Sequence, residues 1–208
     1  MALFGFAKKE KGINGIIRYL GLADFWQACS SQEQKDLIRY YSSGFSTGNR
    51  VSPIEGNVTS SSETPLKYLS SMLGWVIKEK NYPLAEKIVS TGKQIPITER
   101  NLIDAHFFYQ EAAECYYKQR ETNPNAILLS MDCCERDINL FPYYAPLMKN
   151  SYGSLPRIVT FSRLIGIYEK CGRKQDAILL CKKAIEYGLT DNTKGGFPAK
   201  LAKLEKSI

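Results

Sequence analysis

The sequence predicts an all-α protein, folded as an irregular array of antiparallel helical hairpins with about eight or nine helices (an α–α superhelix). Apolar side chains recur at helical spacing through most of the 208 residues, and Gly, Pro and Asn separate the runs. Small residues seven positions apart also recur in the second helix of three candidate hairpins: Ala85 and Gly92, Ala126 and Cys133, and Ala177 and Ala184. The array is irregular because the first members of these pairs are 41 and 51 residues apart.

The composition fits one globular domain over residues 1–208, because 44% of the residues are apolar and 24% are charged. The formal net charge of +7 weakly favours acidic partners. Nucleic-acid recognition requires a clustered basic stripe, whereas much of this excess lies at the two ends of the chain. The terminal lysines are Lys8, Lys9, Lys11, Lys200, Lys203 and Lys206.

Nothing in the sequence indicates a membrane span or a secretion signal. No run of 18 apolar residues occurs, and the first lysines follow a short apolar stretch instead of preceding it. We therefore expect a cytoplasmic protein whose cysteines are reduced and act as small apolar residues. His106, the single histidine, has no cysteine at a ligand spacing, so we expect no metal and no cofactor. The cysteines are Cys29, Cys115, Cys133, Cys134, Cys171 and Cys181.

Residues 13–42 are expected to form an N-terminal helical cap. Apolar residues at 13, 16, 17 and 20 fit one or two short helices that break near Gly21. Ser30 and Glu33 make the capping box of a helix that reaches Tyr41. Residues 43–63, rich in Ser, Gly, Asn and Thr, are predicted to be a surface loop, in which 51–54 could form a short extended piece.

Helix-start signals divide the next part of the chain into two hairpins, 64–94 and 98–140. Thr64 and Pro65 supply an N-cap hydroxyl and a proline at the first helical position. A turn at 81–83 separates the two helices of the first hairpin. Thr98 caps a long helix that runs to about residue 120, and the Asn-Pro pair at 123–124 begins a helix over 125–139.

Residues 141–156 are interpreted as an insert, because the 51 residues between Ala126 and Ala177 exceed the roughly 34 of a regular repeat array. Its candidate aromatic residues are Phe141, Tyr143, Tyr144 and Tyr152. An aromatic-rich loop either anchors a protein partner or seals the end of a core, and the sequence leaves both readings open.

The hairpin at 157–188 is the clearest of the three. After it, residues 195–206 fit an amphipathic helix that caps the array. The loop at 193–196 precedes a helix, where backbone amides can bind an anion. Its sequence lacks the glycine and lysine pattern of a phosphate-binding loop. We interpret it as a turn that lets the capping helix dock.

This last hairpin resembles a tetratricopeptide repeat. Phe161, Leu164 and Tyr168 stand at the repeat's Trp, Leu and Tyr, and Ala177 and Ala184 stand at its two alanines. The longer block from 155 to 197, with the segments LPR, IYEK and TKGGF, resembles a largely uncharacterised group of bacterial and phage repeat proteins. The resemblance implies a tetratricopeptide-like fold and no established activity.

In such a fold the first helix of each hairpin lines a concave face. The candidate groove residues are Lys67, Ser70, Lys78, Gln110, Glu114, Tyr117, Ser162, Glu169 and Lys170. The face is mixed polar with one aromatic, which suits a peptide or protein segment better than an apolar small molecule.

We therefore expect a non-enzymatic protein–protein or peptide-binding module, an adaptor or scaffold whose partner is not named by the sequence. A nucleic-acid-associated protein is the first alternative and rests on the net charge alone. The second is an enzyme with a site between helices, which a buried cluster of His106, Glu111 and Glu114 would indicate. Glu111 and Glu114 lie one turn apart, but no second carboxylate–histidine set completes a helical di-metal site.

Overall fold

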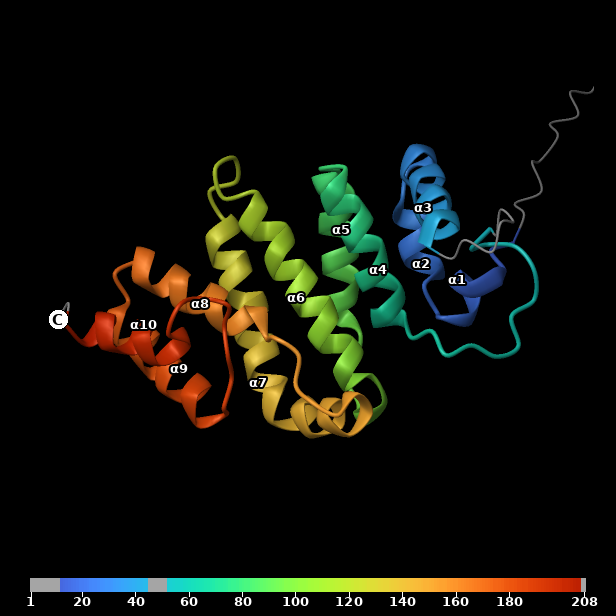
Figure 1. Ribbon diagram of the computed structural model, residues 1–208. Coiled ribbons are helices and arrows are strands. Elements are labelled where there is room, and N and C mark those ends of the chain that lie inside the picture. The colour runs from blue at the N-terminus through green and yellow to red at the C-terminus, as the bar shows by residue number, and fades with distance from the viewer. Residues whose placement is uncertain (1–11, 45–51, 207–208) are drawn as a thin grey trace, which may run out of the picture. The chain divides into compact units, whose positions relative to one another are not determined.

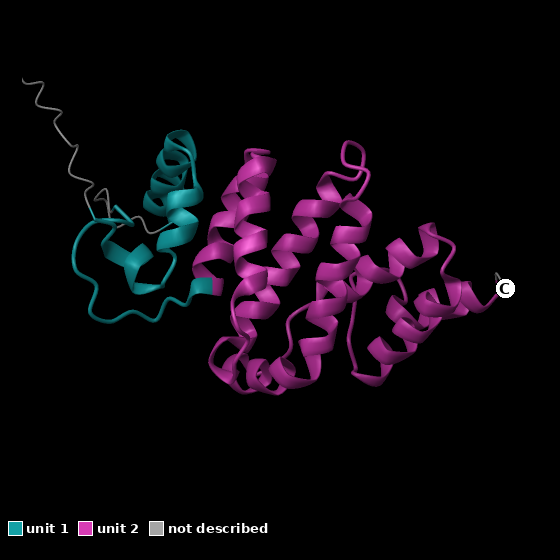
Figure 2. Cartoon of the chain, turned by 180° about the vertical axis from the view of Figure 1, so that it is seen from behind, with its two compact units in different colours: residues 1–65 teal, residues 66–208 magenta. Residues whose placement is uncertain are grey.

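The computed structural model describes residues 12–44 and 52–206. These residues form ten α-helices and one short 3-10 helix, and none of them lies in a β-strand. The all-α prediction is confirmed, with more helices than expected because residues 15–28 form two short helices. Two compact units divide the chain, Met1–Pro65 and Leu66–Ile208 (Figure 2).

Unit 1 contains α1 (Gly15–Tyr19), α2 (Ala23–Ala28) and α3 (Ser31–Gly44). The predicted capping box of α3 is confirmed, since the Ser30 amide donates to Glu33 Oε2 at 2.6 Å and the Glu33 amide donates to Ser30 Oγ at 3.3 Å. Side chains of all three helices are buried, Ile17, Trp26 and Leu37 among them.

The described part of the predicted 43–63 loop covers the start of α1. The Asn14 amide donates to the Ile54 carbonyl at 3.1 Å, and the Gly15 amide donates to the Gly56 carbonyl at 3.0 Å. Gly15 has a positive φ of 60°, and a Cβ there would lie 2.6 Å from the Pro53 carbonyl oxygen. Residues 52–54 form no strand, and residues 45–51, which include Val51 of the expected extended piece, lie outside the described residues.

Unit 2 holds the remaining helices in an up-and-down order (Figure 1). They are α4 (Pro65–Lys78), α5 (Tyr82–Gln94), α6 (Leu102–Lys118), α7 (Ala126–Tyr152), α8 (Val159–Lys170), α9 (Lys174–Glu186) and α10 (Gly196–Glu205), with a 3-10 turn at Glu99–Asn101 before α6. Successive helices from α5 to α10 contact one another. The short connections make neighbours antiparallel.

Two of the predicted helix starts have side-chain caps. Asn81 accepts a hydrogen bond from the Leu84 amide at 3.4 Å, with Pro83 in the first turn of α5. Thr98 and Asn101 form a capping box ahead of α6, in which the Thr98 amide donates to Asn101 Oδ1 at 2.8 Å.

Helix α7 is longer than the helix predicted over 125–139 and includes residues 141–152 of the predicted insert. The helix continues through Pro142 and Pro146 to Tyr152 and ends at Gly153, which has a φ of 75°. The prolines remove two backbone donors, yet Phe141, Tyr144, Ala145 and Met148 are all buried at helical spacing. Burial of this apolar face outweighs the lost hydrogen bonds, and Figure 1 shows α7 changing direction near its C-terminal end.

A buried polar cluster joins α6, α7 and α8. Asp137 on α7 is fully buried, and its Oδ1 lies 2.7 Å from His106 Nδ1 on α6. Its Oδ2 accepts hydrogen bonds from Thr160 Oγ1 on α8 at 2.5 Å and from Tyr144 OH at 3.4 Å. Burial and the nearby Asp137 carboxylate raise the pKa of Tyr144, so its hydroxyl remains a donor.

The turn before α10 is organised by Asp191, whose side chain is buried. Asp191 Oδ1 accepts hydrogen bonds from the Thr193 amide, at 3.0 Å, and from the Thr193 hydroxyl. Asp191 Oδ2 pairs with Lys200 of α10 at 2.5 Å. Burial opposes ionisation, but Lys200 and Thr193 outweigh it and lower the pKa of Asp191. The ionised carboxylate thus ties α10 to the segment that precedes it.

Candidate functional site

Two adjoining pockets follow α4 and α6, with volumes of about 400 Å³ and about 680 Å³. Gly74 and Glu111 line both, so the pockets form one continuous groove. The first is also lined by Lys67, Ser70, Ser71, Ile103, Asp104, Phe107 and Tyr152. The second is also lined by Ile77, Lys78, Lys80, Tyr82, Glu114, Lys118 and Thr122.

Four of the nine groove residues predicted from the sequence line these pockets. Lys67 and Ser70 lie in the first pocket, and Lys78 and Glu114 lie in the second. Gln110 is half-buried on α6 and lines neither pocket. The α4 and α6 parts of the predicted face therefore do meet in one hollow.

The α8 part of the predicted face is attached to α6 through Tyr117. The ring of Tyr117 has three cations over it, with Arg120 at 4.7 Å, Arg163 at 4.8 Å and Lys170 at 5.9 Å from its centroid. Lys170 Nζ also donates to Tyr117 OH at 3.3 Å. Arg163 of α8 forms an ion pair with Glu114 of α6. This tyrosine cluster thus gathers three cations around one aromatic ring.

The other two predicted residues of α8 have different surroundings. Glu169 lies 3.9 Å from Lys203 Nζ and so pairs with the capping helix α10. Ser162 Oγ is buried, and among the described residues no atom forms a hydrogen bond with it.

The four aromatic residues predicted at 141–156 divide into two pairs. Phe141 and Tyr144 are core residues, with rings 5.5 Å apart. Tyr143 and Tyr152 are 65% and 60% exposed. Tyr152 lines the first pocket of the groove, so the end of α7 contributes an aromatic side chain to the α4–α6 face.

Glu111, at the junction of the two pockets, has an unusual electrostatic environment. Burial is the main cause that raises the pKa of its carboxyl, and the neighbouring Glu114 carboxylate adds to it. Lys118 and Arg163 partly offset both effects. The groove therefore holds a carboxylate whose ionised form is destabilised and which a ligand cation would stabilise.

We expect Glu111→Gln to stabilise the protein in a pH-dependent way. Because the pKa of Glu111 is raised on folding, the folded state holds this proton more tightly, and stability is lost as the pH rises through that pKa. Glutamine mimics the protonated acid. The gain in melting temperature over the wild type should be small near pH 4.5, the ordinary pKa, and grow toward pH 7. Glu121→Gln, at a 79% exposed side chain, is the control and should show no such growth.

Four residues that line the groove were not predicted from the sequence: Ile103, Phe107, Lys118 and Tyr82. The available signal was the stripe 103, 107, 111, 114 and 118 on α6, which recurs at helical spacing beside the core positions. Phe107 is 37% exposed, and an aromatic residue on a non-core face indicates a contact surface.

His106, Glu111 and Glu114 have separate neighbours. His106 contacts Asp137 inside the helix bundle, whereas the two glutamates line the groove. Among residues 12–44 and 52–206, no group of three or more His, Cys, Asp or Glu side chains could hold a metal ion.

All six cysteines are free thiols, and Cys171 is the exposed one. Burial is the main cause that raises the pKa of Cys115 to about 12 and that of Cys181 to about 11. Such thiols stay protonated and unreactive at neutral pH.

Comparison with known proteins gives no family model, no curated protein and no solved structure that matches this chain. Within the described part of the chain, no helix combines the length and the apolar character needed to cross a membrane.

Proposed function

We propose that the protein is a non-enzymatic binding module of tetratricopeptide-like architecture, which holds a segment of another protein along α4, α6 and α8. The continuous groove between α4 and α6 carries the proposal. The three hairpins α4–α5, α6–α7 and α8–α9 correspond to the proposed repeats, and α10 to the terminal cap.

The junction of the two pockets favours a Lys or Arg of the segment beside an aromatic or large apolar side chain, whereas the four lysines elsewhere in the groove suit acidic residues. Glu111 offers a half-buried carboxylate to the cation. Phe107 and Tyr152 offer apolar surface in the same pocket. The tyrosine cluster around Tyr117, with its three cations, suits an acidic residue further along the segment.

Selection of phage-displayed random peptides on the immobilised protein tests this proposal. We expect the selected peptides to share a basic residue next to an aromatic or apolar one. Gly74→Leu should weaken their binding at least about tenfold, because a side chain at Gly74 projects into open space where the two pockets meet. Glu111→Lys should weaken it through charge reversal. Fluorescence anisotropy measures both effects.

Glu55→Lys is the matched control, since it reverses a charge at an exposed residue outside both the groove and the tyrosine cluster. Tyr117→Ala and Lys170→Glu test the tyrosine cluster in the same assay. Peptides that bind the Gly74 and Glu111 variants as tightly as the wild type would show that the groove is not the binding site.

The nucleic-acid alternative is tested by titrating a single-stranded oligonucleotide at two salt concentrations. Binding through phosphates would weaken steeply as salt rises, and Lys170→Glu would lower the salt dependence. The peptide proposal expects no such binding.

A further inference from the structure

One side of α9 carries a stripe of charged and apolar side chains. Followed from its N-terminal end the signs are plus, minus, two leucines, plus, minus, and followed from its C-terminal end every sign is reversed. In chain order the stripe is Arg173, Asp176, Leu179, Leu180, Lys183 and Glu186. Its members are three or four positions apart, apart from the adjacent leucines, and therefore share one helix face. Arg173 is the N-cap of α9 and Glu186 is its last residue, so the stripe spans the whole helix.

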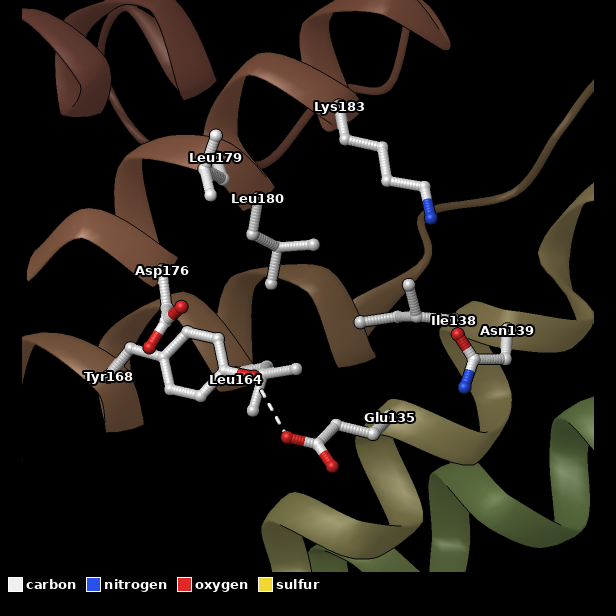
Figure 3. Close-up of a pocket in the computed structure, with 9 residues that line it drawn as sticks. All are labelled: Glu135, Ile138, Asn139, Leu164, Tyr168, Asp176, Leu179, Leu180 and Lys183. Atoms are coloured by element: carbon white, nitrogen blue, oxygen red, sulfur yellow. Dashed lines mark hydrogen bonds between the residues drawn. The ribbon is translucent and has the colours of Figure 1, made fainter. Parts of the chain in front are cut away.

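The centre of the stripe adjoins a pocket of about 330 Å³ between α7, α8 and α9, whose lining combines apolar side chains with Glu135, Asn139, Asp176 and Lys183 (Figure 3). Leu180 points into this pocket toward Leu164 and Ile138. Leu179 lines the same pocket and is 64% exposed. Asp176 lies at one end of the pocket and Lys183 at the other.

An antiparallel copy of α9 would complement this stripe. A twofold axis midway between Leu179 and Leu180 places Leu179 opposite the partner's Leu180. The same axis places Asp176 opposite the partner's Lys183 and Arg173 opposite the partner's Glu186. Each of the two opposite-charge pairs then occurs twice across the interface, which is the self-complementarity that a twofold axis requires.

We propose that α9 mediates homodimerisation, with the α9 helices of two copies antiparallel and each Leu179 covered at the rim of the other's pocket. The surface shares no residue with the α4–α6 groove, so the inference does not depend on the proposed function. Within one copy Arg173 and Asp176 pair at 2.7 Å with 44% of each side chain exposed, and an exposed pair of this kind contributes little. The Arg173 guanidinium also lies over the Tyr168 ring at 4.2 Å, which leaves its exposed edge for a partner. A contact centred on one 13-residue helix is smaller than a standard interface, so we expect a weak, concentration-dependent dimer.

Sedimentation velocity of the full chain over a range of concentrations up to millimolar tests the proposal. The wild type should move from monomer to dimer as concentration rises. Leu179→Asp should raise the dissociation constant on the order of a hundredfold, as for loss of a central contact. Leu128→Asp is the matched control, because Leu128 on α7 is 65% exposed and lies outside the pocket.

Charge reversal tests the antiparallel register. Asp176→Lys and Lys183→Asp should each be monomeric alone, since each places like charges opposite one another. An equimolar mixture of the two variants should dimerise, because every opposed pair then has opposite signs. Circular dichroism checks that each variant is folded. A wild type that stays monomeric throughout, a dimer insensitive to Leu179→Asp, or a mixture that stays monomeric would overturn the proposal.

Discussion

Replacing Asp137 with alanine is expected to lower the free energy of unfolding by about 3–5 kcal/mol, the range for removing one member of a buried polar pair. Asp137 is fully buried and meets His106, Thr160 and Tyr144. Its loss leaves these groups without their acceptor inside the protein, where an unsatisfied polar group costs more than a hydrogen bond contributes. The midpoint of urea denaturation measures the effect.

Asp132→Ala is the matched control on the same helix. Asp132 pairs with Lys93 at 2.9 Å and with Arg136 at 3.0 Å, but 42% of its side chain is exposed. Partly exposed pairs contribute less than about 1 kcal/mol. Asp137→Asn, which keeps the shape, should fall between the two. If Asp137→Ala cost no more than Asp132→Ala, the cluster would not hold α6, α7 and α8 together.

Much of the fold could be predicted from the sequence, because the local sequence signals for helix ends agree with the helix ends in the structure. The capping box at Ser30 and the Thr64-Pro65 start of α4 each determine a helix end through local backbone chemistry. The end of α7 could not be predicted in this way. Pro142 and Pro146 are local helix breakers, and the long-range burial that overcomes them is not visible in a local window.

The candidate site was predictable in part for a similar reason. Helical spacing identifies the non-core face of α4 and α6, which is why Lys67, Ser70 and Lys78 were found. Spacing does not show which side chains of that face already form ion pairs with other parts of the same chain. Glu169 is paired with Lys203 of α10, and Tyr152 reaches the groove because α7 continues past its prolines.

Gly92→Ala is expected to lower the free energy of unfolding by about 1–3 kcal/mol, the range for overpacking a core. Gly92 on α5 faces Phe108 on α6, and a Cβ at this position would overlap Cζ and Cε2 of the ring. Phe108 is fully buried, so its ring can move away only by displacing other core side chains. The effect opposes intrinsic helix propensity, which favours Ala over Gly by about 0.8–1 kcal/mol.

Gly166→Ala on α8 separates packing from propensity. A Cβ at Gly166 meets no atom within 4 Å, so this change should stabilise the protein by about 0.4–1 kcal/mol.

Adding Phe108→Leu to Gly92→Ala should make the double variant less destabilised than the sum of the two single changes, because the shorter side chain leaves room for the methyl group. Additive effects would mean that Gly92→Ala acts through something other than the Phe108 contact. The α5–α6 packing also positions Tyr82 and Lys118 in the groove, so Gly92→Ala should weaken peptide binding.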